Sequence, residues 1–188
     1  MNLILASRSP RRKDLLEKFG FDFSVQVIPT EEVESGDPDS AARANARSKA
    51  LAVSVRYPRS LVLGADTIVV LDGRILGKPK DTRHARAMLE SLNGRQHQVS
   101  TVVALGRGGQ AVRIFKETTL VRFRQLSELE INGYLATGEP FDKAGSYGIQ
   151  GFGGLLVESI KGCYYNVMGL PMPRLAVELR KHGIEVFS

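Results

Sequence analysis

Hydroxyl and basic side chains gather where the first apolar run of the chain ends. Residues 2–6 are typical of a buried strand, and Pro10 favours a helix that begins directly after it. A helix N-terminus offers free N–H groups and the positive end of the helix dipole, so it attracts anions. Ser7 and Arg12 would add a hydroxyl donor and a cation at that place. The segment therefore predicts a binding site for a polyphosphate.

A solvated basic segment, such as a nucleic-acid-binding tail, is the alternative interpretation of the same residues. It would account for Arg11 and Arg12 without any anion site. However, Leu15 and Leu16 follow at helical spacing, and a tail would not lie between two core elements. The anion site is therefore favoured.

Asp66 is the most unusual single position, because it interrupts the apolar run 61–71. An ionised carboxylate in or beside a core strand is costly unless it is paired, hydrogen-bonded or bound to a metal. Gly64 permits a close backbone approach just before it. These residues favour a functional carboxylate, and a structural aspartate capped by neighbouring N–H groups is the alternative.

A second carboxylate could come from Glu31 or Glu32, in the acidic loop 29–39. A pair of carboxylates can hold a hard divalent cation that also bridges to substrate phosphates. The composition of the loop, taken alone, favours solvated side chains.

Two lysines are candidate phosphate ligands. Lys49 lies one turn after Asn45 in an alanine-rich helix, so the two side chains share a face. Taken alone, Lys49 is more typical of a surface position. Lys78 follows Gly77 and precedes Pro79 in a tight loop, whose spacing does not match a nucleotide-binding P-loop.

A glycine-rich loop, residues 142–151, also carries polar side chains. Its glycines permit the backbone to approach a ligand, and Gln150 offers both a donor and an acceptor, as a uracil or thymine edge requires. Tyr147 and Ile149 indicate that the loop is packed against the protein. The three histidines show no metal-ligand spacing: His84, His97 and His182.

Strands and helices alternate through the first half of the chain, and antiparallel pairing follows. Strands are expected over residues 2–6, 21–28, 61–71, 74–76, 98–105, 112–123 and 155–160. Helices are expected from residue 10 and over 40–55, 82–92, 127–136 and 171–182, with loops over 29–39 and 140–154. This order predicts an α/β fold with a mixed, twisted sheet and flanking helices.

The bulk composition fits one globular domain over residues 1–188. The chain is 43% hydrophobic and 24% charged, and it has no apolar stretch of membrane-spanning length. Its single cysteine, Cys163, excludes an intramolecular disulfide and a multi-cysteine zinc site. A cytoplasmic protein is the simplest expectation. The net charge of +6 favours anionic partners. It describes the electrostatic potential of the whole surface and does not locate a binding site.

Taken together, these segments resemble the Maf family of nucleoside triphosphate pyrophosphatases over nearly the whole chain. The order and spacing of the motifs carry the resemblance. The motifs are residues 6–12, Glu31-Glu32, Lys49-Ala50, 64–67, Gly77-Lys78-Pro79, 142–151 and 166–171. The resemblance implies an elongated, two-lobed single domain with a central cleft. It also implies hydrolysis between the α and β phosphates that depends on a divalent metal, Mg²⁺ or Mn²⁺.

The resemblance also implies roles for individual residues. Asp66 would accept the proton of the attacking water, and Glu32 would assist it through metal binding, so that both would be metal ligands. The phosphates would be held by Ser7, Arg12, Lys49 and Lys78. Substrate choice would depend on Arg12, Thr67 and Gln150. The loop 142–150 is similar to the branch of the family that acts on dTTP and UTP, with Ser146 where alanine is common.

Two other functions compete with this interpretation. A nucleic-acid-binding or cell-division regulatory protein would use the basic surface without hydrolysis, but no stacking platform or recognition motif is visible. An enzyme that removes damaged purine triphosphates on a similar fold is the nearer competitor. A nucleotide is the expected partner, nucleic acid and membrane are disfavoured, and a homodimer is plausible.

Overall fold

The computed structural model describes residues 2–33 and 35–186. Its internal contacts divide the chain into two compact units. The first unit comprises Met1–Asp66, Thr101–Glu117 and Gly169–Ser188, and the second comprises Thr67–Ser100 and Thr118–Met168. The expectation of one domain over residues 1–188 stays a prediction.

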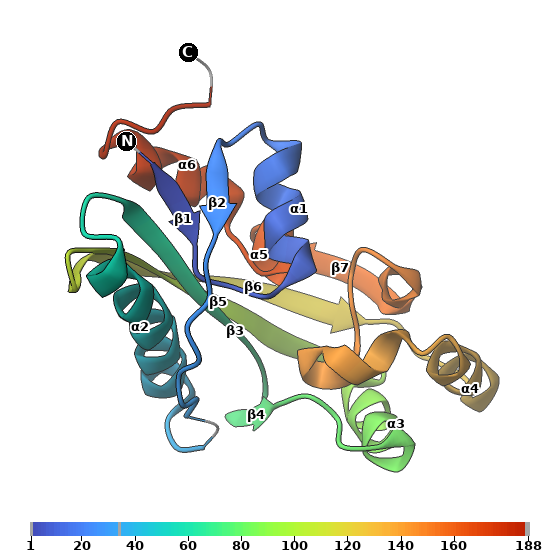
Figure 1. The fold of residues 1–188 in the computed structure, drawn as a ribbon. Coiled ribbons are helices and arrows are strands. Elements are labelled where there is room, and N and C mark those ends of the chain that lie inside the picture. The colour runs from blue at the N-terminus through green and yellow to red at the C-terminus, as the bar shows by residue number, and fades with distance from the viewer. Residues whose placement is uncertain (1, 34, 187–188) are drawn as a thin grey trace. The chain divides into compact units, whose positions relative to one another are not determined.

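The elements alternate along the chain as the sequence predicts (Figure 1). The helices are α1 (Pro10–Lys18), α2 (Pro38–Arg56), α3 (Thr82–Leu92), α4 (Glu128–Ala136), α5 (Tyr164–Met168) and α6 (Met172–Arg180). The strands are β1 (Leu3–Leu5), β2 (Phe23–Val25), β3 (Leu61–Leu71), β4 (Arg74–Leu76), β5 (Gln96–Arg107), β6 (Gln110–Phe123) and β7 (Val157–Lys161).

The strands of the described residues form one mixed sheet in the order β2-β1-β3-β5-β6-β7, with β4 paired to β3. Strand β1 pairs in parallel with both β2 and β3. Strands β3 and β4 are antiparallel, as are β6 and β7. All three residues of β1 are buried, as expected for a parallel strand with neighbours on both sides. The predicted α/β fold with a mixed sheet is confirmed.

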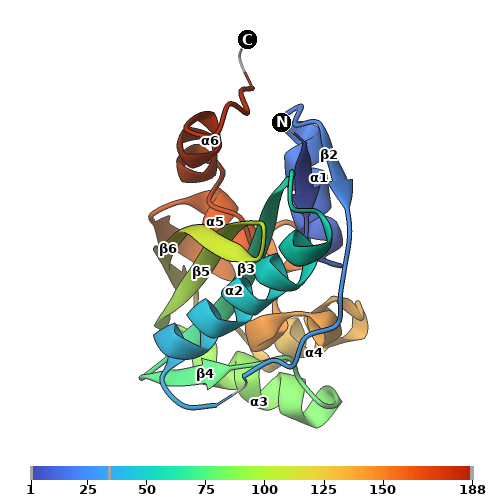
Figure 2. The same cartoon turned by 60° about the vertical axis from the view of Figure 1, so that its left-hand side comes forward.

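In the first unit, helix α2 packs closely against strand β3 (Figure 2). The helix begins at Pro38, and the Asp37 side chain accepts a hydrogen bond from the Ser40 N–H at 2.9 Å. A Cβ atom built on Gly64 would lie 2.5 Å from the Ala46 carbonyl oxygen and 2.6 Å from the Ala50 nitrogen. Only glycine permits this approach, which brings the polar face of α2 to the strand that carries Asp66.

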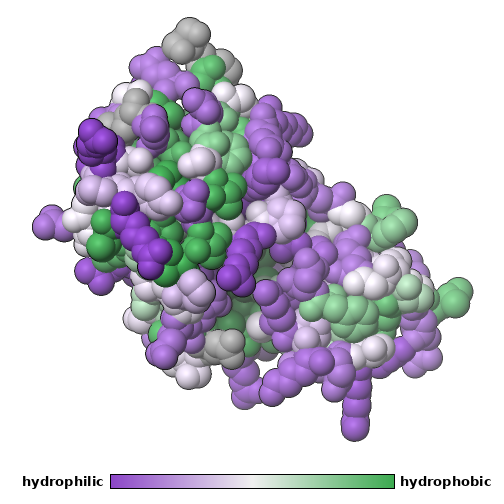
Figure 3. All heavy atoms as spheres, viewed as in Figure 1, coloured by the Kyte–Doolittle hydropathy of each residue, from purple (hydrophilic) through white to green (hydrophobic). Residues whose placement is uncertain are grey.

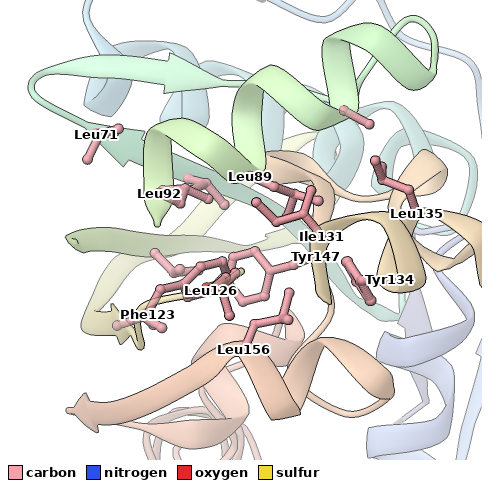
Figure 4. Close-up of a cluster of buried hydrophobic side chains, with 14 residues drawn as sticks. Leu71, Leu89, Leu92, Phe123, Leu126, Ile131, Tyr134, Leu135, Tyr147 and Leu156 are labelled. Carbon is pink, nitrogen blue, oxygen red and sulfur yellow. The ribbon is translucent and has the colours of Figure 1, made fainter. Parts of the chain in front are cut away.

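The second unit has its own apolar core between α3, α4 and the glycine-rich loop (Figure 4). Leu89, Leu92 and Ile131 contribute aliphatic side chains. Tyr147 packs edge-on against Phe123, with ring centroids 4.7 Å apart. The loop is therefore anchored by a buried aromatic side chain, as its sequence predicts.

Several boundaries differ from the sequence-based expectations. Strand β2 covers three residues, not 21–28, because it pairs with the three residues of β1. Helix α5 was not predicted, and the loop expected over 140–154 contains three short 3₁₀ helices: Glu139–Asp142, Ala144–Ser146 and Phe152–Leu156. Short helices of these lengths carry little periodicity for a sequence to reveal.

Hydrophilic side chains cover much of the face drawn in Figure 3, with hydrophobic side chains between them. The exposed large hydrophobic residues of the second unit include Leu129, Phe152 and Leu155. Among the described residues, no helix has both the length and the apolar character needed to cross a membrane.

Candidate active site

Asp66 lies in the middle of β3 and is held by two side chains of α2. Its Oδ1 accepts a hydrogen bond from Lys49 Nζ at 2.8 Å, and its Oδ2 accepts one from Asn45 Nδ2 at 3.3 Å. The Asp66 side chain is 13% exposed, so a bare carboxylate there would be costly. Partners on both oxygens offset that cost and fix the orientation of the carboxylate.

Lys49 joins Asp66 to a second carboxylate. Its Nζ lies 2.8 Å from Asp66 Oδ1 and also 2.8 Å from Glu32 Oε1. The Lys49 side chain is 16% exposed and that of Glu32 is 51% exposed. Lys49 is therefore not the surface lysine that its local sequence suggests, because the acidic loop and β3 surround it with negative charge. Glu31, by contrast, is exposed.

Arg12 is a buried residue of the same unit. Its Nε donates to the Gly169 carbonyl at 3.0 Å, and its Nη1 donates to the Ala65 carbonyl at 2.9 Å. Burial lowers the pKa of Arg12 to about 10, against the opposing influence of Asp66. The guanidinium thus stays charged at neutral pH and also fixes the peptide just before Asp66.

Ser7 completes the cluster that the first unit brings together. Its Oγ accepts hydrogen bonds from Arg12 Nη1 and from the Ser9 N–H, both at 3.2 Å. Because both acceptor positions are used, the hydroxyl proton is left to donate. The first unit therefore places together five of the eight predicted site residues: Ser7, Arg12, Glu32, Lys49 and Asp66.

The other three predicted residues, Thr67, Lys78 and Gln150, belong to the second unit. Thr67 is half-buried directly after Asp66, whereas Lys78 and Gln150 are exposed. The Gly77 carbonyl, just before Lys78, accepts a hydrogen bond from the Gly145 N–H at 3.1 Å. The segment of Lys78 is thereby tied to the glycine-rich loop that carries Gln150.

Glu139 organises this loop, and sequence reasoning did not identify it. Its Oε2 accepts from the Phe152 N–H at 2.9 Å, and its Oε1 accepts from the Gly153 N–H at 3.0 Å. The Tyr134 hydroxyl donates to Oε1 at 2.9 Å, and burial together with this contact raises the pKa of Tyr134. Gln150 therefore lies on a segment whose following residues are fixed by one carboxylate.

Glu32 and Asp66 are the carboxylates of the first unit that could bind a divalent cation. Among the described residues, no group of three or more His, Cys, Asp and Glu side chains is placed to hold a metal. Glu32 and Asp66 nevertheless approach the same ammonium. Mg²⁺ is commonly held by one or two carboxylates, with waters and substrate phosphates as its other ligands. The donor set of this chain fits such an ion.

Comparisons with known proteins identify the family of the chain. The family model described as "Maf-like protein" matches residues 2–182. A dTTP/UTP pyrophosphatase of Symbiobacterium thermophilum is 51% identical, over 99% of this chain and 96% of that protein. Proteins with the same description from Halalkalibacterium halodurans and Pyrococcus abyssi are 51% and 50% identical, over 96% and 97% of this chain. The two matches extend over 96% and 97% of the relatives' own lengths.

Among solved structures, the Ham1 protein of Staphylococcus aureus is similar, with a TM-score of 0.47 and 18% identity. That match covers 65% of this chain and 72% of the Ham1 chain. The family model and the relatives extend over nearly the whole sequence, including every residue of the site. This chain belongs to the Maf family.

Proposed function

We propose that this protein is a nucleoside triphosphate pyrophosphatase that hydrolyses dTTP and UTP between the α and β phosphates. The products would be a nucleoside monophosphate and pyrophosphate. The observation that carries the proposal is the cluster of Asp66, Lys49 and Glu32, in which two carboxylates and a cation meet within hydrogen-bonding distance. The names of relatives about half identical over nearly all of the chain support the same substrates.

Asp66 would act as the proton acceptor for the attacking water. A general base must be held within hydrogen-bonding reach of its water, and this contributes about 10²–10⁴ in rate. Lys49 and Asn45 orient both oxygens of Asp66. When triphosphate oxygens draw the Lys49 ammonium toward themselves, Asp66 Oδ1 would become available to accept the proton.

Cationic and hydroxyl groups would bind the phosphates. A nucleoside triphosphate carries about four negative charges, and more charge builds on the leaving pyrophosphate in the transition state. Ser7 has a proton to donate, and Lys49 supplies a positive charge in the same unit. Arg12 would contribute a buried positive charge, and the exposed Lys78 would contribute a further one.

Glu32 and Asp66 would hold the divalent cation, Mg²⁺ or Mn²⁺. When bound, such an ion neutralises charge on the phosphates and polarises the phosphoryl oxygen. Glu32 is half-exposed on its loop, so its carboxylate can reorient from Lys49 toward an ion. Asp66 offers Oδ2 from a fixed strand position.

Arg12, Thr67 and Gln150 would set substrate choice. Gln150 is exposed and carries both a donor and an acceptor, which suits the two carbonyls and the N–H of a uracil or thymine edge. A base that covers the Gln150 amide on binding must pair with it, so a base with an unmatched edge would bind less tightly.

Pyrophosphate release from a panel of nucleoside triphosphates tests the proposal. We expect selective cleavage of dTTP and UTP that requires Mg²⁺ or Mn²⁺ and stops when the metal is removed with a chelator. Activity confined to inosine triphosphate or other purines would contradict the pyrimidine assignment. Salt-sensitive binding to DNA or RNA with no hydrolysis of any triphosphate would favour the nucleic-acid-binding alternative.

Asp66→Asn tests the role of the carboxylate. We expect a loss of kcat of roughly 100-fold or more with little change in nucleotide affinity or in the free energy of unfolding. Asp72→Asn is the matched control, because Asp72 follows the same strand but pairs with Arg95 at the surface. Activity of Asp66→Asn close to that of Asp72→Asn would remove Asp66 from the mechanism.

A further inference from the structure

Asn45 is a buried polar side chain with three hydrogen bonds, none of which belongs to its own helix. Its Oδ1 accepts from the Val33 N–H at 2.8 Å, and its Nδ2 donates to the Val33 carbonyl at 3.0 Å. Nδ2 also donates to Asp66 Oδ2 at 3.3 Å. The side chain is only 5% exposed, so it joins the acidic loop to β3 beneath the surface.

The hydrogen-bond partners determine the orientation of the Asn45 amide. A flipped amide would turn its oxygen toward the Val33 carbonyl and the Asp66 carboxylate, which are both acceptors. In the observed orientation both amide hydrogens and the oxygen are satisfied. The side chain therefore has one well-defined arrangement, suited to fixing the position of its partners.

Asn45 and Lys49 act on the same two segments by different means. Both lie on one face of α2, one turn apart. Lys49 reaches Glu32 and Asp66 through a charge on a flexible stem, and a triphosphate would compete for that charge. Asn45 instead binds the backbone of Val33, the residue directly after Glu32. None of the three Asn45 hydrogen bonds involves Lys49.

We propose that Asn45 is a positioning residue, which holds Glu32 and Asp66 at the separation required to bind one divalent cation. This inference rests on the proposed function, because it assigns a role within the same site. Without Asn45, the loop that carries Glu32 would lose two backbone hydrogen bonds to α2, and Asp66 would lose the donor to its Oδ2. The conformation in which both carboxylates can bind the ion would then be less populated, and the affinity for the ion would fall.

Asn45→Leu tests the proposal, since leucine has nearly the same volume but no polar atoms. The purified protein alone is titrated with Mn²⁺, and the free ion is followed by electron paramagnetic resonance. We expect the Mn²⁺ dissociation constant to rise at least about tenfold, as is typical when a group that orients a metal ligand is lost. The Mn²⁺ concentration for half-maximal dTTP hydrolysis should rise in parallel.

Ser54→Ala is the matched control on the same helix. Ser54 is buried, donates to the Leu51 carbonyl and accepts from the Gly109 N–H, away from the carboxylates. Its replacement should leave the Mn²⁺ dissociation constant within twofold of wild type. Thermal melts verify that each variant is folded, and Asn45→Ala replaces Asn45→Leu if the leucine variant is not.

The outcomes separate this inference from the proposed function. A folded Asn45 variant with wild-type Mn²⁺ affinity overturns the positioning role, and so does a wild-type protein that takes up no Mn²⁺ in the titration. An equal loss of affinity in Ser54→Ala also overturns it, because the effect would then be general to α2. The proposed function stands or fails separately, on pyrophosphate release by the wild-type protein.

Discussion

Acidification should destabilise this protein through His97, a buried imidazole in the core of the second unit. The side chain is 2% exposed, and its Nε2 lies 2.7 Å from the Tyr147 hydroxyl. Within the described residues its Nδ1 has no hydrogen-bond partner. Burial lowers the pKa of His97 from 6.5 to about 4, because the apolar surroundings disfavour the imidazolium.

The difference between the two pKa values sets the size and the sign of the effect. Below pH 6.5 the unfolded chain binds a proton at this histidine, whereas the folded protein does not until about pH 4. The contribution to stability is therefore complete above pH 6.5 and is lost as the pH falls toward 4. The full difference corresponds to roughly 3 kcal/mol, and about 2 kcal/mol of it falls between pH 7.5 and pH 5.

Urea unfolding of wild-type protein and His97→Gln at these two pH values measures the effect. Glutamine can still hydrogen-bond to Tyr147 but does not titrate. Acidic residues contribute equally to the pH dependence of both proteins. On acidification the free energy of unfolding of the variant should therefore fall by about 2 kcal/mol less than that of wild type. Equal losses in the two proteins would refute the reasoning, since His97 would then have the same proton affinity in the folded and unfolded states.

Two further predictions concern close packing and loop order. Gly64→Ala should reduce the free energy of unfolding by about 1–3 kcal/mol in urea titrations, because its Cβ would lie 2.5 Å from the Ala46 oxygen. Gly133→Ala, in an open position of α4, should raise the free energy of unfolding by about 0.5–1 kcal/mol. A Gly64→Ala variant more stable than Gly133→Ala would contradict the packing argument. Glu139→Ala removes the acceptor of the two N–H groups directly after the glycine-rich loop and should speed proteolytic cleavage of that loop. Glu158→Ala, a surface carboxylate on β7, should not.

Elements with a strong local signal could be predicted from the sequence to within about one residue. Strand β3 covers 61–71 because its apolar run is bounded by a turn at Asp72-Gly73. Asp81 and Thr82 both suit the N-cap of the next helix, and the structure shows that Asp81 takes this position, so α3 covers 82–92. Ser127 and Glu130 form a capping box at the start of α4, a motif that can be read from four adjacent residues. In each case, residues adjacent in the sequence make the deciding contacts.

The site could be predicted only in part, because its geometry depends on contacts between distant segments. The family motifs indicated Asp66 and Lys49, but nothing local shows that the loop of Glu32 folds back onto α2. Asn45 shared a helical face with Lys49, which was the one available signal for it. Glu139 had no signal, since two of the three partners of its carboxylate are backbone N–H groups more than ten residues later.

The contact between Gly64 and α2 restricts which sequences can evolve on this fold. An alanine at position 64 would meet the Ala46 oxygen and the Ala50 nitrogen, both backbone atoms, as well as the Ala50 Cβ. Replacing Ala50 by glycine would relieve only the last of these. No compensating substitution on α2 can remove the other two, because every residue carries the same backbone atoms. Since α2 also carries Lys49, a substitution of Gly64 would move this lysine away from Asp66 together with the helix.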